Sequence, residues 1–467
     1  MSEAMKERSG TSLRRFKPYP AYRDSGVDWL GEIPAHWEVM RLGFNADFIV
    51  PMRDKPADLT GETPWIRIED FGGRYISGSK SGQGVSDRTI REMNLKVFPA
   101  RTVLCSCSCN MGATAIVEKP LISNQTFIGI VPGKNLVSEY VYYLMQVAKE
   151  HLTALATGAI QQYLSRNEFS SLRMPLLPIE EQRGIAAFLD RETAKIDALV
   201  AKKERLIELL QEKRTVLITR AVTKGLPAAA AAQAGLDPNV PMKDSGVEWL
   251  GEIPAHWQCV PLRRSVLSRA GAIKTGPFGS QLLASEMQGG DVKVYNQRNV
   301  IDRDFANGEN FVSREKFKEL SAFAVCKGDV LVTTRGTIGR CAIVPEDAEE
   351  GILHPCLMRI QPDPKQLLRS YLALLIQDSI LVQTQLALAS NATTIDVIYS
   401  DTMGRILVPK PPLEEQAAIV GWVGQRTCEV DSLIKKVSDA SDRLKELRTA
   451  LISAAVTGKI DVREEVV

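Results

Sequence analysis

The sequence has little net charge and few aromatic residues, and it contains no long apolar run. Its 58 basic and 56 acidic residues leave a formal net charge of only +2, so any binding site for a polyanion has to be local. No apolar run approaches the roughly 18–20 residues that cross a bilayer, and the first residues lack the apolar stretch of a secretory signal. We therefore expect a cytoplasmic protein.

The cysteines are too scattered to predict a disulfide framework or a metal site. All eight lie between Cys105 and Cys428, without paired C-x-x-C spacing. Cys105, Cys107 and Cys109 alternate with period two, which places them on one face of a strand rather than around a tetrahedral ion. We expect free thiols and no metal.

Motifs of catalysis are also missing. The chain contains no GxxxxGK[ST], no GxGxxG after a strand, no HExxH, no GxSxG and no Asn-Pro-Pro-aromatic element of the kind that amino-methyltransferases use. Of the four histidines, His36 and His256 belong to a duplicated Ala-His-Trp, while His151 and His354 stand alone. Because no partner constellation accompanies any of them, a packed or surface role is favoured.

What the chain does contain is an internal duplication. With 467 residues it exceeds one ordinary core, so two or more globular units are expected. Residues 24–37 (DSGVDWLGEIPAHW) and 244–257 (DSGVEWLGEIPAHW) agree at thirteen of fourteen positions at an offset of 220. Further matches join 102–117 to 329–344 without gaps at offset 227, and 178–182 to 412–416 and 221–223 to 455–457 at offset 234. We infer a tandem repeat.

Two proline-free segments predict long helices. Residues 179–224 and 413–457 each follow a proline, begin with acidic residues and meet a glycine at Gly225 or Gly458. At 1.5 Å per residue, each helix of about 45 residues would be roughly 67 Å long.

The apolar residues of both segments recur every seven positions, which predicts a coiled-coil seam. The expected seam contains Ile185, Leu189, Ile196, Leu199, Leu206, Leu210 and Leu217 in the first helix, and Ile419, Val423, Val430, Leu433, Ala440, Leu444 and Leu451 in the second. Because the two seams match at offset 234, we expect the helices to pack together. The alternative, two ordinary core helices that each stay within their own domain, remains open.

Two mixed α/β bodies are predicted outside these helices, at residues 20–175 and 241–408. The remaining boundaries are an N-terminal tail at 1–19, a first helical region at 176–225, an Ala-rich linker at 226–240, a second helical region at 409–460 and a tail at 461–467.

The second body holds groups suited to nucleic acid. Residues 261–275 carry four basic side chains and no acidic one, and they lead into the turn GPFGS at 276–280, whose glycines allow a partner to approach the backbone closely. We predict phosphate contacts from Lys274, Gly276 and Ser280. The candidates for reading base edges are Asn296, Gln297, Arg298, Asn299, Arg335 and Arg340, whose amide and guanidinium groups make bidentate hydrogen bonds to purines.

The first body has different side chains at the corresponding positions. There the candidates are Arg67, Asn110, Asn124 and Gln125, and the GPFGS element is absent. Two copies of one frame with different loop chemistry are expected if each copy reads a different target. Ordinary turns with solvated side chains remain the alternative for any single residue.

The ordered set of motifs resembles the specificity subunit of type I restriction-modification enzymes. The resemblance rests on DSGV(D/E)WLGEIPAHW, GPFGSQL, GDVLVTTRGTIGR, and (I/L)EEQ opening a long helix that ends in AVT(K/G), and it covers about residues 20–460. It implies two tandem target recognition domains of α/β (α+β) fold, at 20–175 and 241–408, separated by two long helices in an antiparallel coiled coil with a pseudo-twofold repeat. Each domain would read one half of a bipartite asymmetric DNA site.

The resemblance also implies partners. These are double-stranded DNA, two adenine methyltransferase subunits that use S-adenosylmethionine, and restriction subunits that use ATP and Mg. This chain would itself hold no cofactor and contribute no catalysis. Two alternatives remain: an enzyme with an unrecognised DNA methyltransferase or endonuclease activity, and a coiled-coil adaptor that never touches DNA.

Overall fold

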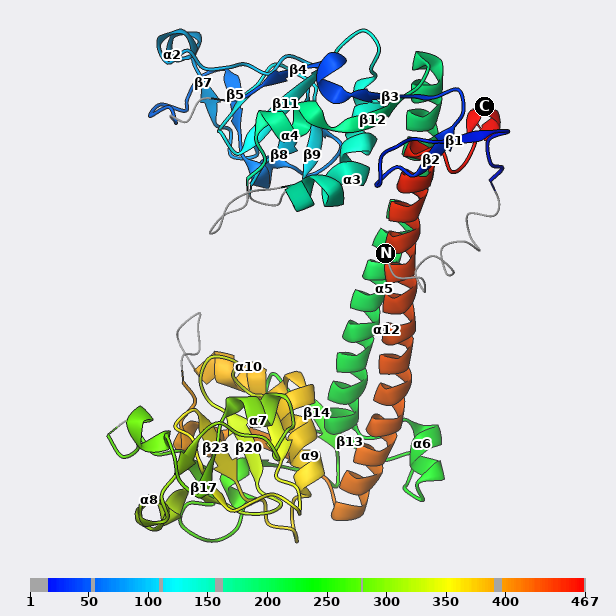
Figure 1. The fold of residues 1–467 in the computed structure, drawn as a ribbon. Helices are drawn as coiled ribbons and strands as arrows, with labels where there is room; N and C mark the ends of the chain where they lie inside the picture. Colours follow the sequence, from blue (N-terminus) through cyan, green and yellow to red (C-terminus); the bar gives the residue numbers. More distant parts are fainter. Residues whose placement is uncertain are drawn as a thin grey trace. The chain divides into compact units, whose positions relative to one another are not determined.

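The chain folds into two compact units (Figure 1). The computed structural model describes residues 16–51, 55–108, 112–155, 163–278, 280–389 and 397–465. Unit 1 comprises Met1–Glu204 and Asp439–Val467, and unit 2 comprises Arg205–Ser438. Each unit therefore contains one half of each of two long helices.

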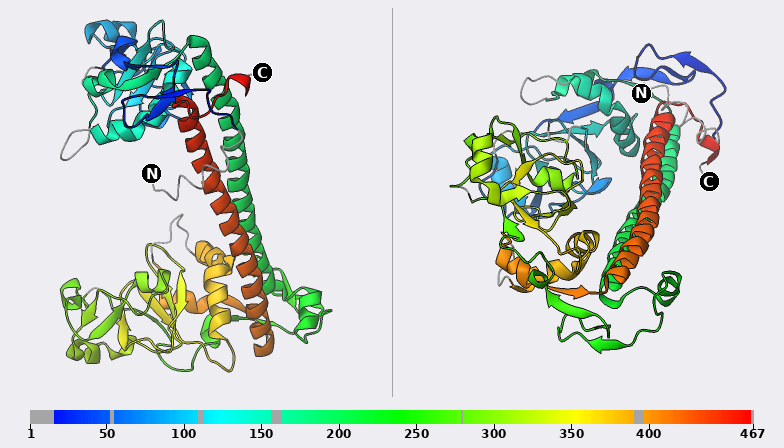
Figure 2. Two further views of the ribbon diagram at one scale, coloured as in Figure 1. Left: turned by 45° about the vertical axis from the view of Figure 1, so that its right-hand side comes forward. Right: turned by 90° about the horizontal axis from the view of Figure 1, so that it is seen from below.

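These helices are α5 (Ile179–Lys224) and α12 (Leu413–Val456), of 46 and 44 residues (Figure 2). Both begin with two glutamates in the first turn, where the exposed amides of the helix favour negative charge. Each is followed by a glycine with positive φ, Gly225 at +78° and Gly458 at +71°. The predicted continuous helices are confirmed.

The helices lie side by side and antiparallel. In unit 1, Leu189 near the start of α5 shares a core with Leu451 near the end of α12. In unit 2, Ile218 near the end of α5 shares a core with Ile419 near the start of α12. Because the start of each helix packs against the end of the other, the alternative of two helices confined to separate domains is excluded.

The phase of one predicted seam row is wrong. Leu199, Leu206 and Leu433 are 47%, 43% and 48% exposed. The following residues, such as Val200 and Ile434, are partly buried instead, and Val200 packs against the core of unit 1. The predicted positions that are buried or partly buried are Ile185, Leu189, Ile196, Leu210, Leu217, Ile419, Val423, Val430, Ala440, Leu444 and Leu451.

Unit 1 contains two principal sheets. The larger has the order β4-β11-β8-β9-β6, and the smaller has the order β10-β5-β7. Their strands are β4 (Ala46–Ile49), β5 (Thr63–Ile66), β6 (Tyr75–Ile76), β7 (Gly84–Val85), β8 (Val103–Ser106), β9 (Thr114–Val117), β10 (Ile122–Ser123) and β11 (Phe127–Pro132). Helices α2 (Asp87–Glu92), α3 (Ser138–Leu155) and α4 (Arg166–Ser171) complete this body. Helix α3 packs on β8, β9 and β11.

Unit 2 repeats this frame. Its sheets have the orders β16-β23-β20-β21 and β18-β17-β22-β19. The strands are β16 (Ile273–Thr275), β17 (Val292–Tyr295), β18 (Phe311–Val312), β19 (Ala324–Val325), β20 (Val330–Thr333), β21 (Cys341–Ile343), β22 (Gly351–Leu353) and β23 (Leu357–Ile360). The helices are α7 (Gln297–Ile301), α8 (Arg314–Glu319), α9 (Arg369–Ala373) with its π-helical extension Leu374–Asp378, α10 (Ile380–Ala389) and α11 (Ser400–Arg405).

The correspondence extends to strand direction and register. The antiparallel run β4-β11-β8-β9 matches β16-β23-β20-β21, and the parallel pair β5/β10 matches β17/β22. The hairpin β1 (Tyr22–Asp24) with β2 (Glu32–Pro34) has the same register as β13 (Met242–Asp244) with β14 (Glu252–Pro254). Likewise β3 (Glu38–Arg41) pairs with β12 (Arg173–Leu176) as β15 (Gln258–Pro261) pairs with β24 (Leu407–Lys410). The predicted duplication of α/β domains is confirmed.

Two segments differ from the predicted boundaries, and a third contains a helix within its predicted bounds. Tyr19 and Val462 fall in the segments predicted as tails, yet both are buried in the core of unit 1. The Ala-rich linker contains a short helix, α6 (Ala228–Gln233), because alanine has the highest helix propensity.

Cys105 and Cys107 lie in the core of unit 1, as their alternation predicts, and Cys109 lies outside the described residues. The seven cysteines that the structure describes are all free. Burial raises the pKa of the Cys107 thiol to about 12. Within the described part of the chain, no cluster of three or more His, Cys, Asp or Glu side chains is placed to hold a metal ion. No helix in this part is long and apolar enough to cross a membrane.

Candidate nucleic-acid interface

The duplicated Ala-His-Trp motif attaches each domain to a long helix. In unit 2 the buried Trp257 donates a 2.9 Å hydrogen bond from Nε1 to Glu415, the third residue of α12, and His256 lies 2.7 Å from the same carboxylate. In unit 1, Trp37 and His36 make the same contacts with Glu181, at 3.1 and 3.0 Å. These bonds hold the start of each long helix next to the strand that follows the motif, β3 in unit 1 and β15 in unit 2.

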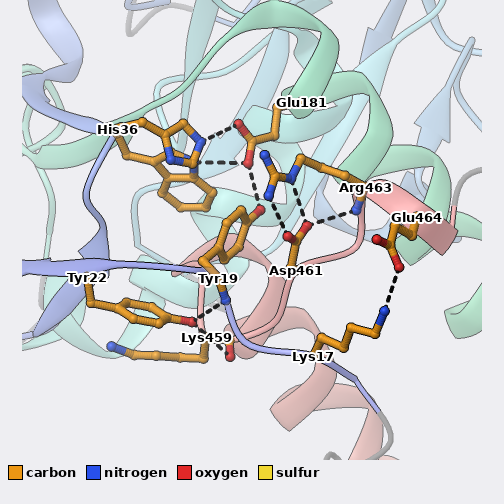
Figure 3. A network of polar contacts seen from close by, with 10 residues as sticks. Lys17, Tyr19, Tyr22, His36, Glu181, Lys459, Asp461, Arg463 and Glu464 are labelled. Carbon is orange, nitrogen blue, oxygen red and sulfur yellow. Dashed lines mark hydrogen bonds and ion pairs between the residues drawn. The ribbon is translucent and has the colours of Figure 1, made fainter.

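The contacts around Glu181 are more extensive than those around Glu415 (Figure 3). Tyr19 donates a 2.7 Å hydrogen bond to Glu181, and the Arg463 guanidinium lies 5.0 Å from the centre of the Tyr19 ring. Burial, the main cause, and the neighbouring Glu181 raise the pKa of Tyr19, so it stays a donor. Asp461 holds Arg463 and donates its own backbone N–H to Lys17 O. Segments from both ends of the described chain thus complete this site in unit 1.

A glutamine beside each glutamate connects the helix start to the loops of its domain. Gln182 is fully buried, accepts a hydrogen bond from Val137 N and donates to Asn135 O. Gln416 makes the same bonds with Leu368 N and Gln366 O. The second glutamate and the glutamine of the Glu-Glu-Gln motif therefore dock each long helix on its domain.

In unit 2 three loops meet at one edge, at the ends of β17, β20 and β22. We call residues 296–299, 334–340 and 354–356 the recognition edge of unit 2. His354 N bonds to Tyr295 O at 2.9 Å, and Thr334 N bonds to Cys356 O at 2.9 Å. Gln297 also donates from Nε2 to Arg335 O. The backbone therefore holds side chains that are distant in sequence at one place.

Two of the predicted base readers have structural roles at this edge. Asn296 caps α7 by accepting hydrogen bonds from Arg298 N and Asn299 N. Asn299 is only 5% exposed, and its amide bonds to Asn296 N, Asp304 O and Asn307 O. Because the amide oxygen and nitrogen of Asn299 are both bonded within the chain, we withdraw Asn299 as a candidate for reading bases. The cap uses the Oδ1 of Asn296, which is partly exposed and stays a prediction.

The charged candidates of the recognition edge face solvent. The Arg298 side chain is 77% exposed and lies 3.6–3.8 Å from Asp302 and Glu309, in loose ion pairs. Arg335 and Arg340 are exposed on the turn after β20. Arginine in this setting keeps its planar fork of donors available for a ligand.

The GPFGS turn differs from its predicted role at Gly276. A Cβ on Gly276 would lie 2.2 Å from His354 O, so the absence of a side chain serves packing within the chain. Lys274 lies over the Phe323 ring, with Nζ 4.8 Å from its centre. Ser280 is exposed, as a contact to phosphate requires.

The equivalent edge of unit 1 has the same backbone frame. Cys107 N bonds to Thr126 O, as Thr334 N does to Cys356 O. Asn124 occupies the position of His354, and its Oδ1 accepts a 3.1 Å hydrogen bond from Thr126 N. This part of unit 1, residues 67–70, 106–108 and 123–126, is the recognition edge of unit 1.

The candidates of unit 1 divide in the same way. Asn124 braces its turn, while Gln125 is exposed. Arg67 is about one-third exposed and forms a 2.7 Å ion pair with Glu69. Asn110 lies outside the described residues.

Comparison with known proteins agrees with this geometry. The family model "Type I restriction modification DNA specificity domain" matches residues 36–209 and again residues 281–423. The chain belongs to this family. The two matches fall on the two copies of the repeat, and together they cover more than half of the chain.

Relatives named as type I specificity subunits match this chain over different shares of its length. The type I restriction enzyme MjaVIII specificity subunit of Methanocaldococcus jannaschii is 22% identical over 440 residues, 92% of this chain and 94% of that protein. The MjaIX specificity subunit of the same organism is 29% identical over 189 residues, which span 39% of this chain and 43% of that relative. A solved structure described as "Structural basis underlying complex assembly and conformational transition of the type I R-M system" matches with a TM-score of 0.61 at 18% identity, over 91% and 98% of the two chains.

The chain is thus a type I specificity subunit, the DNA-recognition component that works within a restriction-modification complex and is itself noncatalytic. These comparisons give no support to the alternative of an enzyme in the same chain.

The histidines of this specificity subunit have more specific roles than the sequence indicated. His36 and His256 do have partners, Glu181 and Glu415, and the signal available was the joint duplication of Ala-His-Trp and Glu-Glu-Gln. His354 belongs to the recognition edge, and its Nδ1 accepts a 3.2 Å hydrogen bond from Cys356 N. Burial and the nearby Arg335 lower the pKa of His354.

Proposed function

We propose that each unit reads one half of a bipartite, asymmetric DNA site through its recognition edge. The observation that carries this proposal is that one backbone frame is built twice with different exposed side chains. Unit 2 presents the exposed Arg298 and Arg335 and the partly exposed Gln297, whose Nε2 donates to Arg335 O. Unit 1 presents the exposed Gln125 and the partly exposed Arg67. Different groups on one frame select different base edges, because purines and pyrimidines differ in the donors and acceptors they offer in the major groove.

The proposal includes the partners that perform the chemistry. Two methyltransferase subunits that use S-adenosylmethionine, and restriction subunits that use ATP and Mg, would dock on this chain, with the long helices setting the distance between the half-sites. The exposed Leu199 and Leu433, 47% and 48% accessible, support two equal docking sites because they occupy equivalent positions on α5 and α12. Because its ligand is DNA, we place the complex in the cytoplasm.

The test is the sequence that the reconstituted complex methylates. Replacing Arg298 by Ala removes a bidentate donor, so we expect at least one base position of one half-site to become degenerate, with a loss of about 1–3 kcal/mol in discrimination. The matched control is Arg314→Ala, an exposed arginine of the same unit that lies outside the recognition edge. An unchanged target and affinity for Arg298→Ala would remove this residue from the proposal.

The alternatives are separated by the purified chain alone. Methyl transfer or cleavage without added subunits would support an enzyme in this chain. Absence of any salt-sensitive duplex binding would support the adaptor instead, because phosphate contacts make DNA binding weaken with salt.

A further inference from the structure

Unit 2 contains an open groove beside its recognition edge. The groove has a volume of about 560 Å³ and lies between residues 263–273 and helix α11. Its polar walls include Arg263, Ser268, Arg269 and Ser400. Arg269 is held in place by two hydrogen bonds to Gln361, at 3.1 and 2.5 Å.

A reciprocal exchange between the two copies of the repeat makes room for this groove. In unit 1, Gly43 faces Ser170, and a Cβ on Gly43 would lie 2.9 Å from Ser170 O. In unit 2 the equivalent positions are Arg263 and Gly404, and the Cβ of Arg263 lies 3.5 Å from where a Cβ on Gly404 would be. In unit 2 the glycine lies on helix α11, and the segment that faces it has room for the Arg263 side chain.

The groove carries positive charge, of which that of Arg269 is partly balanced by the buried carboxylate of Asp329 behind Gln361. Arg263 and Arg269 have no ion-pair partner among the residues that the structure describes. The acidic residue on the groove wall, Asp401, is paired with Arg405 at 2.7 Å. Arg264 next to the groove is also exposed, whereas its equivalent in unit 1 is Phe44. The cations at positions 263 and 264 are therefore specific to unit 2, whereas on the helix wall unit 1 has the exposed Arg166 at the place of Ser400.

The groove is continuous with the recognition edge. Ser400 on its wall accepts a 3.0 Å hydrogen bond from Thr275 N, and Thr275 directly precedes Gly276, which packs against His354. A ligand that contacts the edge therefore extends naturally along the groove. In a DNA duplex, the groups that flank the base edges are phosphodiesters.

We propose that this groove binds the phosphodiester backbone of DNA beside the half-site read by unit 2, through Arg263 and Arg269. The inference rests on the proposed function, because it assumes that unit 2 faces DNA. Phosphate contacts position a protein on the duplex without reading sequence. Because unit 1 has Gly43 and Phe44 at the equivalent places, the two half-sites differ in backbone contacts as well as in bases.

The decisive variant transfers the arrangement of unit 1 into unit 2. The double substitution Arg263→Gly with Gly404→Ser reproduces the pair that unit 1 already accommodates at this junction, so we expect the variant to fold. In the reconstituted complex we expect affinity to fall about tenfold on specific and nonspecific duplexes alike. The slope of log K against log salt should fall by about 0.9 for each phosphate that the variant no longer binds. The methylated sequence should stay the same.

Two control measurements accompany this experiment. Arg314→Ala removes a cation from an exposed site of unit 2 away from the groove and should leave the salt slope as in the unaltered complex. The melting temperature of the double variant reports whether it folds, and Arg263→Gln serves as a second variant if it does not.

An unchanged salt slope in the folded variant would overturn the inference. So would a loss of methyltransferase subunits from the complex with intact DNA affinity, because the groove would then bind an acidic protein surface. If the unaltered complex itself shows no salt-dependent duplex binding, the proposed function fails instead, so the two failures are distinguishable.

Discussion

Trp257 and Glu415 are 158 positions apart in sequence and are joined by a 2.9 Å hydrogen bond from the indole Nε1 to the carboxylate. The same bond joins Trp37 to Glu181 at 3.1 Å. Both indoles are fully buried, so each long helix is anchored to its domain by a donor that has no access to water. This repeated bond explains why the two motifs are duplicated together.

Replacing Glu415 by Ala should destabilise unit 2 by about 1–3 kcal/mol, because the Trp257 N–H would remain buried without an acceptor. Denaturant unfolding followed by tryptophan fluorescence measures this change. The control is Glu414→Ala, a neighbour in the same helical turn that takes no part in the buried bond. Equal losses of stability from both substitutions would mean that the buried hydrogen bond contributes no more than the exposed glutamate does.

Glu181→Ala should cost more than Glu415→Ala. Glu181 accepts hydrogen bonds from Tyr19 and Trp37 and contacts His36. The side-chain hydrogen bonds of Glu415 within the described part of the chain are those with Trp257 and His256. The double variant Tyr19→Phe with Glu181→Ala tests whether the hydrogen bond from Tyr19 causes this difference in stability. In the Glu181→Ala background, the loss of stability from Tyr19→Phe should largely disappear. A full loss in that background would contradict the shared network.

Substitutions along α5 should follow the observed seam phase. Val200→Ala removes atoms packed against the core of unit 1 and should cost about 1 kcal/mol. Leu199→Ala should cost less despite its larger side chain, because that side chain is 47% exposed. Thermal unfolding of the two variants gives the ranking, and the reverse order would restore the phase expected from the sequence.

Gly276→Ala should destabilise the loop it lies in by about 1–3 kcal/mol, because the new Cβ would overlap His354 O. Gly336→Ala is the comparison. Gly336 has φ of +65°, and no atom lies within 4 Å of the position that a Cβ would take there, so its cost is limited to backbone strain of about 1 kcal/mol. Urea unfolding midpoints distinguish the two, and equal shifts would show that the close approach at Gly276 relaxes freely.

The stability of unit 2 should contain a contribution from His354 that depends on pH. Because the pKa of His354 is lowered in the folded state, the unfolded chain takes up a proton first as the pH falls below about 6.5, and stability declines. His354→Asn introduces the residue found at the equivalent Asn124 and keeps an acceptor for the turn. Melting temperatures between pH 8 and pH 5.5 should therefore fall less in this variant than in the unaltered chain.

The duplicated frame was predictable because gapless alignment preserves backbone contacts. The offset of 227 places Cys107 on Thr334, and the structure gives both the same hydrogen bond to the neighbouring strand end. The use of side chains was less predictable. Asn296 and Asn299 have the chemistry of base readers, but the cap of α7 uses the Oδ1 of both, and the Nδ2 of Asn299 donates to Asp304 O and Asn307 O. Residue type alone does not reveal such a commitment, because the cap and an external base compete for the same groups.

The sequence by itself determined the repeat, the two long helices and the seven-residue period of their seam, since these depend on order along one chain. Only the tertiary structure decided the seam phase. Leu199 and Val200 are adjacent and both apolar, so hydrophobicity leaves two registers open, and packing against the core of unit 1 selects Val200. The recognition edges and the groove beside Arg263 likewise exist only after folding, because strand ends far apart in sequence must meet before their side chains act together.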